Sequence, residues 1–227
     1  MAAAKKQLFT TPLGVAAPYA SLHKPDFGND QFPQPRGEYK VNLIVPLKQA
    51  APMIAKLQKI ADDSYAEMVE ENTANPPKVA AGKRPVPVRQ GDMPWFEDGN
   101  GNVVFKFKCY ASYEKDGEKR EINLKVADSR GKKMDVVPNI SGGSELKVRF
   151  SVFPYKWNTA VGASIKLQLD GVMLVKLVEF GGGSDDDWGD EVVEGGFEAD
   201  ENSAGDFNEP DYSEEEQGSA PAADDDF

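Results

Sequence analysis

From residue 103 onward, apolar and polar residues alternate one by one. In the stretch VVFKFKCYASY, one alternate set is largely apolar and consists of Val103, Phe105, Phe107, Cys109, Ala111 and Tyr113. The other set consists of Val104, Lys106, Lys108, Tyr110 and Ser112. Because successive side chains of a strand point to opposite faces of a sheet, the first set is predicted to build a core and the second to lie on an open surface.

Two later stretches repeat this pattern and also carry bases on the outward set. In ELKVRFSVF, Lys147 and Arg149 are expected to point outward, and the buried set is Leu146, Val148, Phe150 and Val152. In IKLQL, Lys166 and Gln168 are expected outside, and the buried set is Ile165, Leu167 and Leu169. EINLKVAD is a further predicted strand, and the turn sequences KDGEK, DSRGKK and SGGS separate these segments. Three strands are therefore predicted to present basic outer faces.

The first half of the chain predicts one strand and one helix. Residues 1–36 are rich in Pro, Gly and aromatic residues, and we expect an irregular arm laid over the core. EYKVNLIVP follows as a strand, with Tyr39, Val41, Leu43 and Val45 on one face. The next segment has apolar residues at helical spacing, with Pro52 in its first turn and Pro76 and Pro77 at its end. Five or six short strands and one amphipathic helix predict a small barrel or sandwich.

The segment between this helix and residue 103 contains too many prolines for a regular element. It is predicted to be a basic loop over residues 78–89, with Lys78, Lys83, Arg84 and Arg89.

The charge of the chain is divided between two parts. Residues 181–227 hold 18 of the 38 acids and no Lys or Arg, so residues 1–180 hold the other 20 acids and all 26 bases. The formal net charge of −12 therefore hides a body of +6 and a tail of −18. Low hydrophobicity and charge of one sign predict that residues 181–227 form a disordered acidic tail, whereas residues 1–180 form the folded body. Repulsion of a polyanion is expected only from the tail.

Aromatic residues are interleaved with bases at the end of one predicted strand. PYKWNTAVG brings Tyr155, Lys156 and Trp157 together, and Tyr110 follows Lys106 and Lys108 on the outward set of its strand. A binder of single-stranded nucleic acid needs this combination, because bases stack on aromatic rings and phosphates pair with cations. Two plainer interpretations stay open at this point: the lysines are ordinary solvated surface, and Tyr155 and Trp157 pack beneath a hairpin.

Several other chemistries are not supported by the sequence. One cysteine and one histidine allow neither an intramolecular disulfide nor a structural zinc site. DGNGNV begins like a calcium loop but lacks the required Gly and Glu, so it is predicted to be a hairpin turn. No phosphate loop, nucleophile–histidine pair or cofactor motif is present, so we expect a non-enzymatic protein without metal or cofactor. No signal peptide or membrane span is predicted, which favours a soluble intracellular protein.

The phrases AAPYA, KPDFGN, PRGEYKVNL, GDMPWF, FKFKCYAS and above all PYKWNTAVGAS closely resemble the single-stranded DNA-binding protein of T-seven-like, short-tailed bacteriophages. The resemblance covers residues 5–183. It implies an OB-fold, a five-stranded Greek-key barrel, in a homodimer that coats single-stranded DNA during replication, recombination and repair and anneals complementary strands. It also implies contacts with the phage DNA polymerase and primase-helicase in the cytoplasm of the infected bacterial host.

The resemblance also assigns residues. The DNA-contacting positions of the family fall on Arg36, Lys108, Tyr110, Tyr155 and Trp157. The outward bases and the basic loop complete the expected DNA-binding set with Lys106, Lys147, Arg149, Lys156, Lys83 and Arg84. One departure is Ala81, which stands where the family has an arginine before the GK dipeptide, so the contact of this loop with DNA depends on Arg84.

The tail suggests a regulatory hypothesis. A flexible chain of 47 residues spans roughly 40 Å, which matches the diameter of about 40 Å expected for the body. Its end, with Asp224, Asp225, Asp226 and Phe227, resembles phosphates followed by a stacked base. The tail is therefore predicted to compete with DNA for the groove and to bind replication proteins when DNA displaces it. The alternative is an acidic-tailed chaperone or scaffold whose barrel binds another protein.

Overall fold

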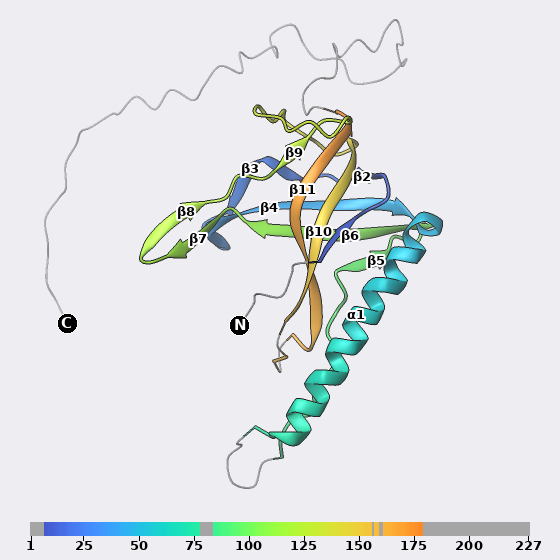
Figure 1. Cartoon of the computed structure of the whole chain (residues 1–227), viewed down its shortest axis with the longest axis vertical. Coiled ribbons are helices and arrows are strands. Elements are labelled where there is room, and N and C mark those ends of the chain that lie inside the picture. Colours follow the sequence, from blue (N-terminus) through green and yellow to red (C-terminus); the bar gives the residue numbers. More distant parts are fainter. Residues whose placement is uncertain (1–6, 78–83, 156, 159–160, 179–227) are drawn as a thin grey trace, which may run out of the picture. The chain divides into compact units, whose positions relative to one another are not determined.

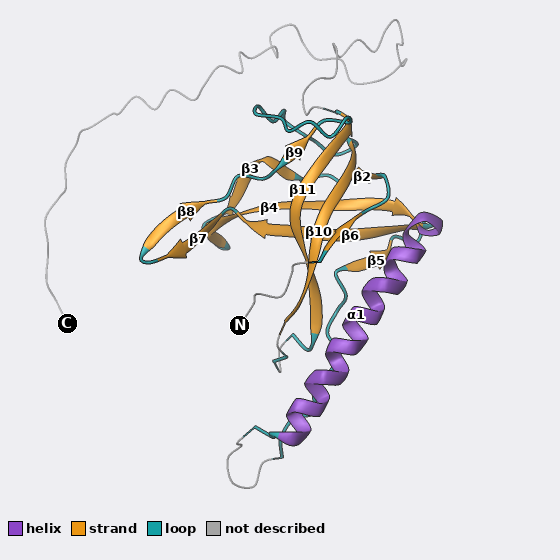
Figure 2. Ribbon diagram, viewed as in Figure 1, coloured by secondary structure: helices purple, strands orange, loops and turns teal. Residues whose placement is uncertain are grey.

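The computed structural model describes residues 7–77, 84–155, 157–158 and 161–178. The expected mainly β fold with one helix is confirmed (Figure 2). Among the described residues the strands are β1 (Leu8–Thr10), β2 (Gly14–Ala16), β3 (Ser21–Gly28), β4 (Pro33–Pro46), β5 (Trp95–Glu97), β6 (Asn102–Tyr110), β7 (Ser112–Lys115), β8 (Glu118–Glu121), β9 (Val126–Ala127), β10 (Glu145–Tyr155) and β11 (Ser164–Lys176). The helix is α1 (Leu47–Ala74). The expected disordered tail lies outside the described residues.

Five strands pair in a closed ring (Figure 1). β4 pairs with β6, β6 runs parallel to β11, and β11 pairs with β10. The short strand β2 completes the ring, because it pairs with both β10 and β4. The main sheet has nine strands in the described part of the chain rather than the expected five, since β1, β3, β5 and β9 add to the ring at β10, β4, β6 and β11.

Several of these strands correct the sequence-based prediction. The expected irregular arm over residues 1–36 contains β1, β2, β3 and the start of β4. Three-residue strands carry no readable periodicity, and they form only because longer strands elsewhere in the chain offer them free edges. The predicted strand EINLKVAD is also wrong in part, because only its first residue and Val126–Ala127 are paired.

The ring encloses an aromatic and aliphatic core. Phe105, Phe107 and Phe150 are each at most 1% exposed, and the ring centroids of Phe107 and Phe150 lie 5.0 Å apart. The predicted inward faces of β4, β6 and β11 are confirmed. The burial of these apolar side chains gives the main driving force for closing the sheet.

The predicted alternation of VVFKFKCYASY, which spans β6 and the start of β7, fails near its two ends. Val104 is buried because it lies between Ile44 of β4 and Phe96 of β5. Ser112 is buried and Tyr113 is exposed, the reverse of the prediction. The cause is Ala111, which belongs to neither strand and shifts β7 out of phase with β6.

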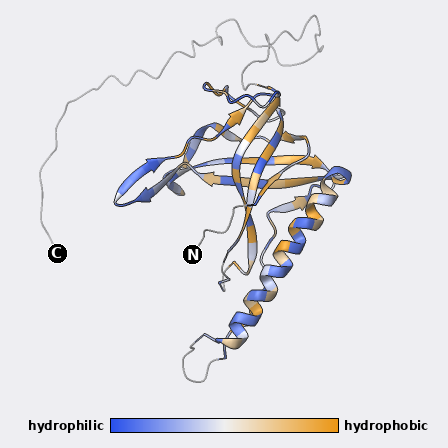
Figure 3. Cartoon of the chain, viewed as in Figure 1, coloured by the Kyte–Doolittle hydropathy of each residue, from blue (hydrophilic) through white to orange (hydrophobic). Residues whose placement is uncertain are grey.

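The helix is attached to the core by its first half only. Its buried residues are Ala50, Met53, Leu57 and Ala61, and the residues after Ala61 are half-buried or exposed. The helix begins directly after β4, so Pro52 lies in its second turn rather than in the first turn as predicted. Polar residues cover much of the second half and of the β7–β8 hairpin (Figure 3). Within the described residues, no helix has an apolar stretch long enough to cross a bilayer.

We expect the replacement Leu57→Ala to lower the free energy of unfolding by about 2–5 kcal/mol, because Leu57 is 0% exposed and its loss leaves a cavity. The matched change Val69→Ala, on the second half of the same helix, should shift it by less than about 0.5 kcal/mol, since Val69 is 37% exposed. Urea unfolding followed by circular dichroism measures both. Similar losses for the two variants would show that the whole helix is anchored.

Candidate nucleic-acid interface

The strands β4 and β6 present one continuous polar surface on the outside of the ring. Its outward residues, which we call the β4–β6 face, are Arg36, Glu38, Lys40, Asn42, Lys106, Lys108 and Tyr110. The antiparallel register places Lys40 opposite Lys108, Asn42 opposite Lys106 and Glu38 opposite Tyr110. The structure thus brings together four of the predicted site residues: Arg36, Lys106, Lys108 and Tyr110.

Tyr110 is 38% exposed and is flanked by cations. The guanidinium carbon of Arg36 lies 3.8 Å from the centroid of the Tyr110 ring, and the Nζ of Lys166 lies 5.7 Å from it. Arg36 is fixed by reciprocal hydrogen bonds: its Nε donates to the carbonyl oxygen of Ser112, and the Ser112 hydroxyl donates to the carbonyl oxygen of Arg36. Such an arrangement of a ring and cations binds a stacked base beside a phosphate.

The residue after Arg36 is glycine for a steric reason. Gly37 has a φ of +62°, a conformation that other residues rarely adopt. A Cβ at this position would lie 3.0 Å from the Phe27 ring. The backbone can therefore turn tightly here and deliver the Arg36 side chain to Tyr110.

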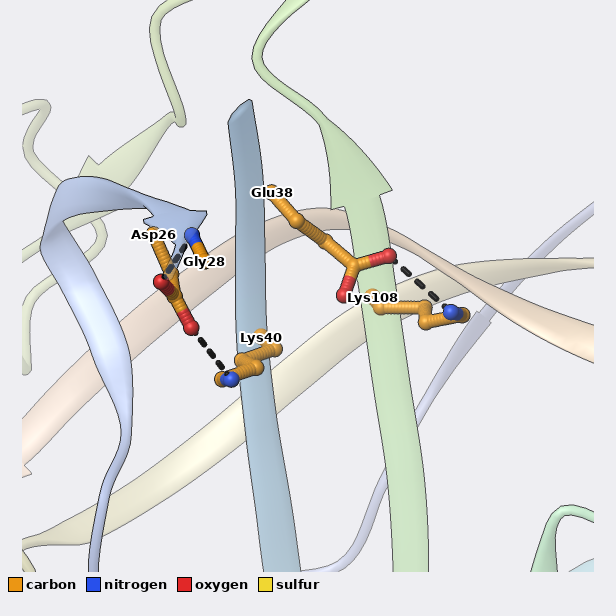
Figure 4. A network of polar contacts seen from close by, with 5 residues as sticks. All are labelled: Asp26, Gly28, Glu38, Lys40 and Lys108. Carbon is orange, nitrogen blue, oxygen red and sulfur yellow. Dashed lines mark hydrogen bonds and ion pairs between the residues drawn. The ribbon is translucent and has the colours of Figure 1, made fainter. Parts of the chain in front are cut away.

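Two lysines of the β4–β6 face are paired with carboxylates (Figure 4). The Nζ of Lys108 lies 3.0 Å from Oε1 of Glu38, and the Nζ of Lys40 lies 2.5 Å from Oδ2 of Asp26 on β3. The hydrogen bond from Lys40 lowers the pKa of the Asp26 carboxyl, and the backbone N–H of Gly28 lowers that pKa further. The face is therefore a mixed charged surface rather than a purely basic one.

A row of paired residues connects this face to the other side of the ring. Lys108 lies beside Gln168 on β11, Gln168 is opposite Ser151 on β10, and Ser151 is opposite Leu8 on β1. The row ends at a groove of about 620 Å³ between β1, β9, β10 and β11. Backbone pairing thus leads from the β4–β6 face to the groove, while the Ser151 side chain itself is buried.

Lys147 and Arg149 line this groove rather than the β4–β6 face. Lys125 and Lys133 reach the same groove from the segments on either side of β9. One acid, Asp170, also lines it, and its Oδ2 accepts a hydrogen bond from the Ser151 hydroxyl at 2.7 Å. The groove therefore holds four cations and one carboxylate.

The predicted aromatic pair lies at the end of β10 and just beyond it. Tyr155 is half-buried opposite Ser164 of β11, and Trp157 is also half-buried. The Nε1 of Trp157 is buried and has no hydrogen-bond partner among the described residues. Phe153 lies two residues before Tyr155 on the same strand, opposite Lys166, and is 40% exposed. Phe153 and Lys166 therefore link the aromatic pair to Tyr110.

Of the remaining predicted residues, only Arg84 is described, and it lies apart from this surface. Arg84 is exposed in a segment that continues along α1, where the hydroxyl of Tyr65 donates a hydrogen bond to the carbonyl oxygen of Val88. Lys83, Lys156 and the tail with Asp224, Asp225, Asp226 and Phe227 lie outside the described residues.

Sequence reasoning missed five residues of the combined surface: Lys40, Phe96, Lys125, Lys133 and Phe153. Lys166 was predicted to point outward from a basic strand but was not included in the expected DNA-binding set. The period-two pattern that buries Tyr39 and Val41 also places Lys40 outward, so this signal was present in the sequence. Lys106 lies over the Phe96 ring at 5.1 Å, a contact between two strands that no local pattern reveals. In the described parts of the chain, no group of three His, Cys, Asp or Glu side chains is arranged to hold a metal.

We expect the pKa of Asp26 to rise toward its usual value of 3.8 when Lys40 is replaced by Met, because the largest cause of its lowering is removed. A carboxyl with a lowered pKa stabilises the fold above its unfolded pKa, and this contribution is lost as the pH falls through the folded value. Carboxyl NMR titration measures the change. Asp98 is the internal control, since hydrogen bonds from Asn102 and Asn100 lower its pKa independently of Lys40. An unchanged Asp26 pKa would contradict the pairing.

Comparison with known proteins shows the family to which the chain belongs. Residues 13–177 match the family model described as single-stranded DNA-binding protein, bacteriophage T7. The chain is 51% identical over 233 residues to the single-stranded DNA-binding protein of Enterobacteria phage T3, with full coverage of both chains. It is 55% identical over 200 residues to that of Escherichia phage T7, with 86% of each chain covered. The crystal structure of the protein encoded by bacteriophage T7 superposes with a TM-score of 0.70 at 50% identity, covering 86% of this chain and 100% of that chain. The chain therefore belongs to the family of single-stranded DNA-binding proteins represented by that of bacteriophage T7.

Proposed function

We propose that this protein binds single-stranded DNA without sequence preference, with the β4–β6 face as the centre of the site. The observation that carries the proposal is Tyr110, a partly exposed ring flanked by Arg36 and Lys166 in line with Lys106 and Lys108. A ring stacks on any base and a lysine pairs with any phosphate, so such a surface tolerates all sequences. The membership of the family supports the same function.

We propose that the bound DNA strand continues from the β4–β6 face across β11 toward the groove. Gln168 and Ser151 connect Lys108 with the groove in which Lys147 and Arg149 lie, and Phe153 offers a further exposed ring on the way. Tyr155 and Trp157 would contact bases at the end of β10. In this arrangement, cations that pair with phosphates and rings that stack on bases alternate over four β-strands.

We further propose that the protein anneals complementary strands and works as a homodimer in the cytoplasm of the infected host. The acidic tail is proposed to compete with DNA for the basic surface, because residues 181–227 carry 18 acids and no bases against a body of +6. A tethered tail acts at an effective concentration on the order of millimolar. Once displaced by DNA, it would bind basic surfaces of the phage DNA polymerase and primase-helicase.

The binding site is tested by two replacements that separate charge from stacking. Lys106→Ala should weaken binding to fluorescent oligo-dT and make the slope of log affinity against log salt less steep by about 0.7, since one phosphate contact is lost. Tyr110→Ala should cost about 1–3 kcal/mol of binding free energy at every salt concentration with little change of slope. Lys56→Ala on the exposed side of α1 is the control and should change neither quantity. Absence of oligo-dT binding by the wild-type protein would overturn the proposal and favour the alternative of a protein scaffold.

The tail is tested by comparing the full chain with residues 1–183. Binding of oligo-dT by the shorter chain should be tighter, and the difference should shrink as salt rises, because the competing interaction is electrostatic. Fluorescence anisotropy at two salt concentrations is sufficient. Equal affinities would leave the DNA-binding function intact and exclude competition by the tail.

A further inference from the structure

The cations around Tyr110 fall into two classes. Arg36, Lys106 and Lys166 contact aromatic rings and have no carboxylate partner among the described residues. Lys40 and Lys108, which lie opposite each other at the centre of the β4–β6 face, each have one. The central lysines are thus partly neutralised in the free protein.

The pair of Lys108 and Glu38 is built into the sheet. The Glu38 side chain is only 12% exposed, whereas that of Lys108 is 57% exposed. Both residues lie within paired strands, since Glu38 is opposite Tyr110 on one side and opposite Asp26 on the other. The carboxylate therefore stays beside the lysine, while the ammonium group remains open to an incoming ligand.

A carboxylate and a phosphate bind an ammonium group in the same way. Both accept short, charge-assisted hydrogen bonds through an anionic oxygen, so they compete for one lysine. In Figure 4 the two carboxylates point toward the ammonium groups of the two central lysines. These oxygens mark places beside the lysines where phosphate oxygens of a bound strand can lie.

We propose that Lys40 and Lys108 are two phosphate subsites and that Asp26 and Glu38 occupy them in the free protein, so that Glu38 lowers the affinity for single-stranded DNA. The proposal rests on the proposed function and adds Lys40, Asp26 and Glu38 to it. Binding at Lys108 exchanges one anion for another and leaves Glu38 next to the strand. Because Lys108 gives up its ion pair with Glu38 when it binds a phosphate, the net free energy gained from that phosphate contact is smaller, and DNA binds more weakly.

Glu38→Gln is the sharpest test, because glutamine keeps the size and hydrogen-bonding ability of the side chain but removes its charge. Asp26 is less suitable, since its carboxylate also accepts a hydrogen bond from the backbone N–H of Gly28. The full-length variant should bind fluorescent oligo-dT roughly fivefold more tightly than the wild-type protein at 50 mM salt. This factor corresponds to the loss of one partly exposed ion pair that competes with DNA. The slope of log affinity against log salt should become steeper by about 0.7, so the gain should shrink about 2.6-fold at 200 mM salt.

Two controls separate this effect from a general change of charge. Glu67→Gln, on the exposed side of α1, changes the net charge equally and should leave the affinity unchanged. Lys108→Ala should abolish the gain when it is combined with Glu38→Gln. Thermal unfolding of each variant verifies that the fold is retained.

The possible results are distinct. A gain that depends on Lys108 and is absent in Glu67→Gln supports the proposal. An unchanged or lower affinity of Glu38→Gln would overturn it, because Glu38 would then position Lys108 for DNA rather than compete with DNA. An equal gain in Glu67→Gln, or a gain that persists without Lys108, would also overturn it. If the wild-type protein itself does not bind oligo-dT, the proposed function fails, and this inference fails with it.

Discussion

The pairing of β6 on both of its edges determines the outer surface of this protein. β6 pairs with β4 over nine residue pairs and with β11 at Phe107 and Lys108, so the strand cannot rotate about its axis. Phe107 must then face the core while Lys106 and Lys108 face outward. A slip of one residue would exchange the two sets and bury the lysines. The apolar core and the row of cations are therefore two results of a single register.

The same register accounts for the suitability of the proposed binding surface for a flexible chain rather than a rigid one. The cations and rings come from different strands, so they lie across the sheet as well as along it. A single strand of nucleic acid can bend to follow such a path, and its bases are free to turn toward the rings. Acids are also present on this surface, and their position next to lysines makes the local charge differ from the formal charge of the body.

The long strands and the helix could be predicted from the sequence, because their periodicity extends over many residues. The inward faces of β4, β6 and β11 follow directly from alternation, and so do the outward lysines. The three-residue strands β1 and β2 could not be predicted, since only the edges of β4 and β10 make them strands. The phase shift at Ala111 could not be predicted either, because it depends on a long-range hydrogen bond from the Ala111 N–H to the carbonyl oxygen of Gly37.

The candidate site was predicted as a set of residues but not as an arrangement. Sequence reasoning placed Lys108 and Arg149 on one basic surface, whereas the structure places them on the β4–β6 face and in the groove. The partners of the lysines could not be predicted, because no local sequence pattern relates Asp26 to Lys40. The two residues contact each other through the pairing of β3 with β4. Family resemblance supplied Arg36, and only the structure shows that it contacts Tyr110.

The contact between Arg36 and Tyr110 has a consequence for the entropy of binding. Side chains that are ordered only when a ligand arrives cost about 0.5–1.5 kcal/mol each. Here the hydrogen bond from Nε to the Ser112 carbonyl oxygen already orients the guanidinium group, the bond from the Ser112 hydroxyl holds the Arg36 backbone, and the guanidinium group lies against the Tyr110 ring. The ordering of both side chains is completed during folding. At the proposed site, a base that stacked on Tyr110 would meet a preorganised surface and would cost little further side-chain freedom.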